Sequence, residues 1–156
     1  TKTSLDRVFT SAVSKVSTIE AISALASLPR TRLTARSTII ETAAVGLPGR
    51  DAGGPYLNAA ALIETALKPR DLLAALHEIE RSRGRDRAAE PERWMPRALD
   101  LDLLLYGQLT INEPGLTIPH PRLHERRFVL EPLSQIAADW PVPGRGQTIA
   151  GLLASL

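Results

Sequence analysis

The sequence predicts an α/β fold, more closely α+β, of the split β-α-β, ferredoxin-like kind, in which helices flank an antiparallel sheet. Three observations support this prediction. Segments with helical spacing and segments rich in β-branched residues follow one another in the order β-α-β-β-α-β. The 156 residues suffice for one hydrophobic core and are few for two, so we expect a single domain over residues 1–156. Because only six residues are aromatic, that core must consist mainly of Leu, Ile, Val and Ala.

The N-terminal half is expected to form three strands and one helix. Arg7–Ala12 is a strand candidate, and Thr18–Leu28 carries apolar residues at helical spacing. Arg32–Thr42 alternates loosely and is rich in Thr and Ile, which favours a strand. Gly46–Pro55 contains four glycines and two prolines, which predict a loop. Tyr56–Leu67 has no clear period, and we expect a strand because a helix there would abut the next helix.

The C-terminal half begins with a helix over Lys68 to about Arg83, which has a proline in its first turn. Its apolar face is formed by Leu72, Leu73, Leu76 and Ile79. A charged loop, Gly84–Arg97, then leads into a strong strand, Ala98–Tyr106. After this strand we expect a short return strand over Leu109–Ile111 and then a proline-rich segment up to Pro121. Two helices are expected to follow, over Arg126–Ala138 and over Thr148–Leu156.

Composition narrows the class of partner and the compartment. The net charge of +2 is small and no block of like charge runs along the chain, so we expect no nucleic-acid partner. The absence of cysteine excludes disulfides and thiolate metal sites and fits a cytoplasmic protein. No stretch approaches 18 apolar residues, and the first thirty residues lack a signal-peptide pattern, so no membrane partner is expected. We expect a monomer that acts on small molecules.

The strand over Ala98–Tyr106 carries the most informative pattern. Alternation places Asp100 and Asp102 on one face and the leucines at odd positions on the other, namely Leu99, Leu101, Leu103 and Leu105. Two carboxylates roughly 7 Å apart repel each other unless a cation lies between them. Mg²⁺, bound by carboxylates together with substrate phosphates, fits this pair best. The alternative is an edge strand whose acidic face is solvated or paired with arginine.

The loop before this strand is rich in arginine and contains Trp94, one of only two tryptophans. The four arginines of this loop are Arg85, Arg87, Arg93 and Arg97. Arginines that lead directly into a metal-binding strand could clamp a polyphosphate, and Trp94 could stack on a planar heterocycle. The alternative is a solvated loop in which Glu90 and Glu92 neutralise two of the arginines.

Pro119 and Pro121 enclose His120, with Arg126 and Phe128 shortly after. A histidine held rigidly near phosphates could donate a hydrogen bond to the group being transferred. An ordinary surface histidine is the alternative.

Three motifs together resemble the 6-hydroxymethyl-7,8-dihydropterin pyrophosphokinase family of folate biosynthesis. They are Arg93-Trp94-x-Pro96-Arg97-x-Leu99-Asp100-Leu101-Asp102, Pro55-Tyr56-Leu57-Asn58-Ala59 and Ile118-Pro119-His120-Pro121. The resemblance runs from about Pro29 to the C-terminus and implies a ferredoxin-like fold that binds ATP and a dihydropterin. It also implies that the products are AMP and the pterin diphosphate.

The resemblance assigns roles position by position. Asp100 and Asp102 would ligate two Mg²⁺ ions. Catalytic, phosphate-contacting positions are Arg85, Arg87, Arg93, Arg97, His120 and Arg126. Asn58 would hydrogen-bond the pterin edge, and the remaining substrate-binding positions are Thr42, Val45, Tyr56, Trp94 and Phe128. His77 and Glu80 lie where the family lines its nucleotide site.

Three positions depart from the family pattern. Val13-Ser14-Lys15-Val16-Ser17 stands where a Gly-Ser-Asn-Leu-Gly turn is usual. Ala44 replaces a proline, and Met95 replaces a small residue. The lost turn therefore leaves one alternative open, a catalytically weakened paralogue that binds pterin or nucleotide as a regulatory module. A second alternative is another metal-dependent phosphoryl transfer or nuclease activity that uses the two aspartates.

Overall fold

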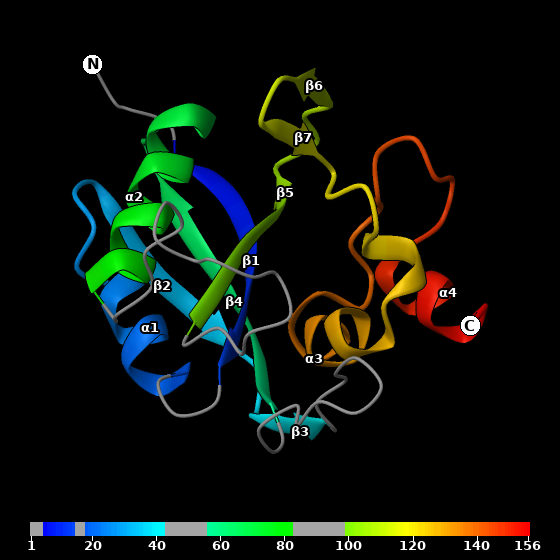
Figure 1. The fold of residues 1–156 in the computed structure, drawn as a ribbon. Coiled ribbons are helices and arrows are strands. Elements are labelled where there is room, and N and C mark those ends of the chain that lie inside the picture. The colour runs from blue at the N-terminus through cyan, green and yellow to red at the C-terminus, as the bar shows by residue number, and fades with distance from the viewer. Residues whose placement is uncertain (1–4, 15–17, 43–55, 83–98) are drawn as a thin grey trace, which may run out of the picture.

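In the computed structural model, residues 5–14, 18–42, 56–82 and 99–156 are described, and they form an antiparallel sheet with helices on both faces (Figure 1). The strand order is β2-β4-β1-β5, and a short strand, β3, pairs with the start of β4. The strands are β1 (Asp6–Ser14), β2 (Thr31–Arg36), β3 (Ile40–Thr42), β4 (Tyr56–Thr65) and β5 (Leu99–Tyr106). Because β4 lies between β1 and β2, the split β-α-β plan predicted from the sequence is confirmed.

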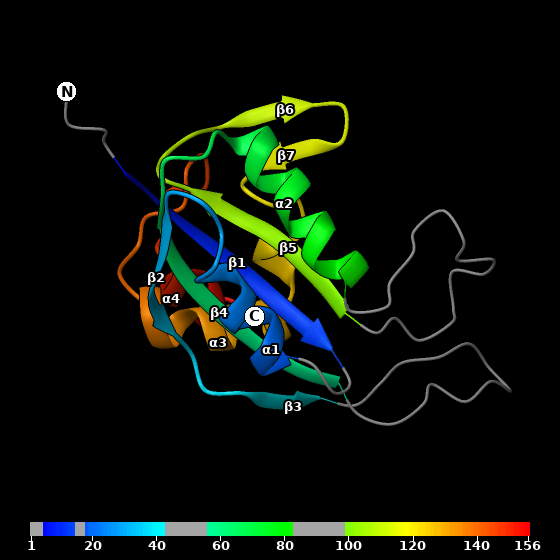
Figure 2. The same cartoon turned by 90° about the vertical axis from the view of Figure 1, so that its left-hand side faces the viewer.

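The helices are divided between the two faces of the sheet, as Figure 2 shows. On one face, α1 (Thr18–Leu25) and α2 (Pro69–Ser82) bury Ala21, Leu25 and Leu72 against the sheet. On the other face, α3 (Arg127–Ala137) and α4 (Ile149–Ala154) pack over a second apolar cluster that contains Phe9 and Leu133. The apolar residues of α1, α2 and α3 therefore face the sheet, and those of α4 pack against α3.

The predicted strand Arg32–Thr42 is in fact two strands, because the chain leaves the ladder at Ser37. The hydroxyl of Ser37 accepts a hydrogen bond from the backbone N–H of Ala60, and its own N–H donates to the Ala60 carbonyl. Both backbone groups of Ala60 are thus bonded to a single residue, and regular pairing resumes only at Ile40, opposite Asn58. Such a side-chain bond to the backbone competes with the sheet ladder.

The predicted return strand Leu109–Ile111 is shifted and pairs elsewhere. The strand is β6 (Ile111–Glu113), and it forms a two-stranded hairpin with β7 (Leu116–Ile118), which lies inside the segment expected to be irregular. Gly115 has a φ of 77°, a value that favours glycine and closes this hairpin tightly. A short 3-10 helix, η1 (Leu123–Glu125), precedes α3.

The expected alternation along β5 fails at its C-terminal end. Leu99, Leu101 and Leu103 belong to the core under α1 and α2, as predicted, but Leu105 belongs with Leu104 to the core under α3 and α4. The cause is a β-bulge: Phe9 pairs with Leu105 and the next residue of β1 pairs with Leu103, so Leu104 is an extra residue. An extra residue reverses the faces of everything after it.

No helix in the described part of the chain is long and apolar enough to cross a membrane. The predicted loops Gly46–Pro55 and Gly84–Arg97 lie outside the described residues.

Candidate functional site

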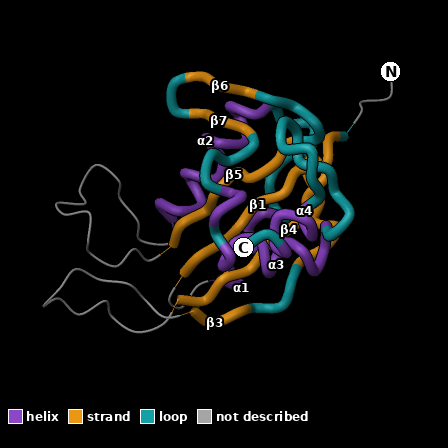
Figure 3. The backbone as a smooth tube through the Cα atoms, turned by 90° about the vertical axis from the view of Figure 1, so that its right-hand side faces the viewer, coloured by secondary structure: helices purple, strands orange, loops and turns teal. Residues whose placement is uncertain are grey.

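The candidate site lies on the face of the sheet that α3 covers, where three strands run side by side (Figure 3). Val13 on β1 pairs with Asn58 of β4 on one side and with Asp100 of β5 on the other. Two residues before Val13 on β1, Ser11 pairs with Asp102. Phe9 lies in the cluster under α3, so strand alternation places Ser11 and Val13 on that face too. Two positions implied by the resemblance, Asn58 and Asp100, are thereby brought into one row.

The two aspartates fit a divalent cation that takes further ligands from a substrate. Asp100 and Asp102 are both half-buried and alternate with the buried leucines of β5, as the sequence predicts. The described residues contain no group of three or more His, Cys, Asp or Glu side chains close enough to hold a metal. Mg²⁺ commonly binds through one or two carboxylates, with phosphates and water completing its shell. The donor set present is therefore suited to Mg²⁺ bound together with a polyphosphate.

His120 faces this pair of carboxylates. Its Nε2 lies 4.0 Å from Oδ2 of Asp102. Its Nδ1 accepts a hydrogen bond of 3.1 Å from the backbone N–H of Arg122. The backbone N–H of His120 donates to the Leu104 carbonyl at 2.9 Å. These bonds fix the ring on the outer edge of β5. Because Nδ1 is an acceptor, the neutral ring carries its proton on Nε2, the atom directed at Asp102.

The charge state of His120 follows from its surroundings. Burial lowers the pKa of His120 below its usual value, and the positive charge of Arg126 acts in the same direction. Asp100 opposes this shift, and Arg122 adds a further lowering of the pKa. The imidazole is consequently neutral at pH 7 and offers an N–H donor rather than a positive charge.

A cavity of about 320 Å³ opens beside Asp102 and His120. Its walls come from α2, β5 and β7 and from the segment after β7, and comprise Leu73, His77, Leu101, Asp102, Leu103, Gly115, Leu116, Thr117, His120 and Pro121. His77, one of the two residues implied for the nucleotide site, is therefore brought to Asp102. The lining combines apolar side chains with polar ones, among them His77, Asp102 and His120, as small-molecule sites do.

Glu80, the other residue implied for the nucleotide site, is 1% exposed. Its carboxylate accepts a hydrogen bond of 2.8 Å from the backbone N–H of Leu101, the residue between the two aspartates. Glu80 thus ties α2 to the outer edge of β5 behind the carboxylate pair. Its assignment to a nucleotide site stays a prediction.

Asn58 has an unused acceptor in the site. Its side-chain N–H₂ donates to the Thr42 hydroxyl at 2.7 Å and to the Ile40 carbonyl at 3.0 Å, which fixes the orientation of the amide. Its Oδ1 is buried and has no hydrogen-bond partner. A buried acceptor without a partner is costly, so this atom is suited to a ligand that brings an N–H donor.

Of the aromatic positions, Tyr56 lies two residues before Asn58 on β4, and Phe128 lies on α3, which packs against β4. Tyr56 begins β4 and pairs with Thr42. Phe128 is in the first turn of α3, which packs on β3 and β4, and it is 37% exposed although it is large and apolar. The Arg126 guanidinium lies 5.6 Å from the centre of the Phe128 ring. An exposed aromatic ring beside a cation is a suitable platform for a flat ligand.

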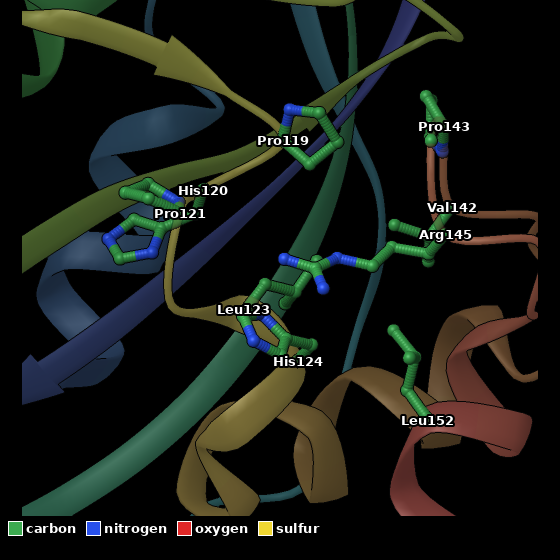
Figure 4. Close-up of a pocket in the computed structure, with 10 residues that line it drawn as sticks. Pro119, His120, Pro121, Leu123, His124, Val142, Pro143, Arg145 and Leu152 are labelled. Carbon is green, nitrogen blue, oxygen red and sulfur yellow. The ribbon is translucent and has the colours of Figure 1, made fainter.

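A second cavity, of about 220 Å³, lies on the other side of His120 and Pro121, which line both cavities. Figure 4 shows the guanidinium of Arg145 extending toward Leu123 and His124 in this second cavity.

Several predicted site residues lie outside the described residues: Val45, Arg85, Arg87, Arg93, Trp94 and Arg97. Conversely, no pattern in the sequence singles out Ser11, because its position opposite Asp102 depends on strand pairing.

Comparison with known proteins finds similarity to one family. Residues 10–138 match the family model described as 7,8-dihydro-6-hydroxymethylpterin-pyrophosphokinase. The chain is 39% identical over 135 residues to a 2-amino-4-hydroxy-6-hydroxymethyldihydropteridine pyrophosphokinase of Pseudomonas aeruginosa, covering 86% of this chain and 79% of that protein. It is 45% identical over 98 residues to one of Synechocystis, covering 63% of this chain and 49% of the relative, about half its length.

A solved structure supports the fold alone. The crystal structure of Plasmodium falciparum HPPK-DHPS matches 99% of this chain and 45% of its own with a TM-score of 0.72, at 11% sequence identity.

Proposed function

The chain belongs to the 7,8-dihydro-6-hydroxymethylpterin-pyrophosphokinase family, and from this premise we propose its reaction. It is an ATP-dependent diphosphokinase that transfers a pyrophosphoryl group to the hydroxymethyl group of 6-hydroxymethyl-7,8-dihydropterin in folate biosynthesis. The hydroxymethyl oxygen attacks the β-phosphorus of ATP, the bond between that phosphorus and the oxygen bridging to the α-phosphate breaks, and AMP leaves. The hydroxyl proton is lost, and the pterin diphosphate is the other product.

The observation that carries this proposal is the row formed by Asn58, Val13 and Asp100. Asn58 offers a buried acceptor to the N–H edge of the pterin, and Asp100 offers a carboxylate to the metal of the nucleotide. Two strand spacings, roughly 10 Å, separate their backbones. A pterin held at Asn58 can therefore direct its hydroxymethyl group toward phosphates held at Asp100, so that the reacting atoms meet.

We assign two Mg²⁺ ions to Asp100 and Asp102, which would neutralise the charge of the phosphates and orient them. His120 then donates a hydrogen bond from Nε2 to a phosphate oxygen, since that nitrogen carries the proton and faces the carboxylates. Arg126 adds a positive charge on the side of the acceptor. Stabilisation of this kind needs no covalent intermediate.

The nucleotide is assigned to the cavity beside Asp102. Its apolar walls, with Leu73 of α2 and Leu116 of β7, accommodate a flat base, while Asp102 and His120 stand where the phosphates would lie. His77 lines the same wall and would contact the nucleotide directly, whereas Glu80 would act through the backbone of β5.

The arginines and the aromatic residue of the Gly84–Arg97 loop complete the proposal. Arg85, Arg87, Arg93 and Arg97 would clamp the triphosphate, and Trp94 would cap the substrates. Tyr56, Phe128, Thr42 and Val45 would surround the pterin. We further propose that the protein works as a monomeric single domain. Its proposed location is the cytoplasm, which fits the absence of cysteine.

The test is the formation of AMP, measured by ion-exchange chromatography. We expect AMP only when ATP, Mg²⁺ and the pterin alcohol are all present. Asp102→Asn abolishes the product, whereas Asp139→Asn, which alters an exposed carboxylate after α3, leaves the rate unchanged. No AMP from the wild-type protein at saturating substrates would refute the proposal.

A further inference from the structure

Two buried hydroxyl groups on β1 lack a hydrogen-bond partner. They belong to Thr10, which is 1% exposed, and Ser11, which is 3% exposed. Other buried hydroxyls in the described residues are bonded: Thr18 donates to the Leu57 carbonyl, and Ser37 accepts from the Ala60 N–H. A buried hydroxyl without a partner costs free energy, so each of the two calls for an explanation.

The surroundings of the two hydroxyls differ because neighbouring residues of a strand face opposite ways. Ser11 lies on the α3 face, where its neighbours along β1 are Phe9 and Val13 and its cross-strand neighbours are Ala60 and Asp102. Three of these four side chains are apolar. Asp102 alone among them can accept a hydrogen bond.

Thr10 lies on the opposite face and has only apolar neighbours. Val8 and Ala12 flank it along β1, and Ala61 and Leu103 lie across from it, all within the core under α1 and α2. The Thr10 hydroxyl therefore has no neighbouring group to bind, whereas that of Ser11 adjoins a proposed metal ligand.

We propose that Ser11 is a positioning residue for Asp102. Its hydroxyl donates a hydrogen bond to the Asp102 carboxylate when Mg²⁺ binds and so holds the carboxylate in the orientation that the cation requires. Directly opposed residues of an antiparallel pair have Cβ atoms roughly 5 Å apart, within reach of one rotation about χ1 of Ser11. Partners that orient metal ligands in this way contribute substantially to metal affinity.

This inference rests on the proposed function, because it takes Asp102 as a metal ligand. It nevertheless concerns a separate property, the affinity of the site for the cation. A serine that only filled space would contribute nothing to that affinity. Its replacement by alanine would then leave the folding stability unchanged or raise it, because an unbonded buried hydroxyl would be removed.

The experiment measures Mn²⁺ binding to the full chain in the presence of a non-hydrolysable ATP analogue, from the electron paramagnetic resonance signal of free Mn²⁺. Ser11→Ala is expected to weaken Mn²⁺ binding roughly tenfold. Ser11→Thr, which keeps the hydroxyl, restores affinity to within about threefold of wild type. Thr10→Val, which removes the equally buried hydroxyl of the other face, leaves it unchanged. Without metal, Ser11→Ala melts no lower than wild type.

The controls separate the two proposals. If the wild-type protein binds no Mn²⁺ with the analogue, or Asp102→Asn binds it as tightly as wild type, the proposed metal site is wrong. If those two behave as expected but Ser11→Ala binds Mn²⁺ like wild type, or Thr10→Val weakens binding equally, the role of Ser11 alone is refuted.

Discussion

Asn58 and Asp100 lie in register on either side of Val13, two strands apart on one face of the sheet. Val13 is half-buried, and strand alternation places its side chain on that same face, between the proposed pterin and metal positions. Glycine is usual at this place in the family that the motifs resemble. In the proposed complex, a branched side chain there would occupy space through which the acceptor approaches the phosphates.

Val13→Ala is therefore expected to lower the KM for the pterin alcohol, by roughly three- to tenfold, because it removes two methyl groups from the path of the acceptor. The KM for ATP should not change. Steady-state kinetics with each substrate varied in turn measures both values. Leu57→Ala is the matched control, since it truncates a half-buried residue of β4 on the other face. A higher KM for the pterin in Val13→Ala would contradict the prediction.

Asn58→Leu tests the recognition of the acceptor. The substitution keeps the branching and the number of heavy atoms of the side chain but removes the buried acceptor Oδ1 and the donor to Thr42 and Ile40. We expect a loss of pterin affinity of at least about 100-fold, because the N–H edge of the ligand would lose its partner in a desolvated site. Titration calorimetry with the pterin alcohol measures the loss.

Thr42→Val supplies the control for this variant. It removes one acceptor of the Asn58 amide but leaves Oδ1 and the bond to the Ile40 carbonyl in place, so the loss of affinity should be much smaller. Equal losses in the two variants would show that the effect comes from the packing of β3 and not from Oδ1.

The sequence predicts the carboxylate pair well because the pattern is local. Asp100 and Asp102 alternate with Leu99 and Leu101, and a period of two over one strand assigns faces without knowledge of any partner. The prediction for Leu105 is wrong because the bulge exists only in the pairing of β5 with β1. No local pattern within β5 reveals it.

The same reasoning explains why Ser11 and the break at Ser37 could not be predicted. Ser11 becomes relevant only through its register with Asp102, ninety-one positions along the chain. Ser37 ends β2 because its hydroxyl meets the backbone of Ala60 on a neighbouring strand. Strand register depends on contacts between distant segments, so a single sequence gives the elements and the residue types but not these neighbours.

Tyr106 should make the stability of the protein fall at high pH. Its hydroxyl donates to the Leu67 carbonyl and to Oδ2 of Asp6. The distance from the hydroxyl oxygen to Oδ2 of Asp6 is 3.2 Å. Burial, followed by the charge of Asp6 and the hydrogen bond to it, raises the pKa of Tyr106 from 10.0 to about 12. Because this pKa is raised in the folded state, the contribution of Tyr106 to the free energy of unfolding is complete below a pH of about 10 and is lost as the pH rises toward 12.

We therefore expect the free energy of unfolding to decrease between pH 10 and about 12 more steeply in the wild-type protein than in Tyr106→Phe. Urea unfolding at intervals of pH measures the two slopes. The difference in absorbance at the phenolate band between the two proteins should titrate near pH 12 in the folded state. Identical slopes for both proteins would contradict the expectation.

Substitutions of His120 can separate the roles of its two ring nitrogens. In Gln, the amide N–H₂ falls near the place of Nε2, whereas in Asn the amide oxygen falls near the place of Nδ1 and nothing reaches Asp102. Nε2 faces Asp102, and Nδ1 only accepts from the Arg122 N–H. If the proposed donor to phosphate is Nε2, His120→Asn should reduce kcat by roughly 100-fold, and His120→Gln by about tenfold or less.

Single-turnover kinetics at saturating ATP and pterin measures the chemical step for both variants. His124→Gln is the control, because His124 lies in η1 and lines the cavity on the other side of His120. It should leave the rate unchanged. The reverse order, with His120→Asn faster than His120→Gln, would assign the contribution to the loop geometry that Nδ1 maintains, and not to a hydrogen bond from Nε2 to the transferred group.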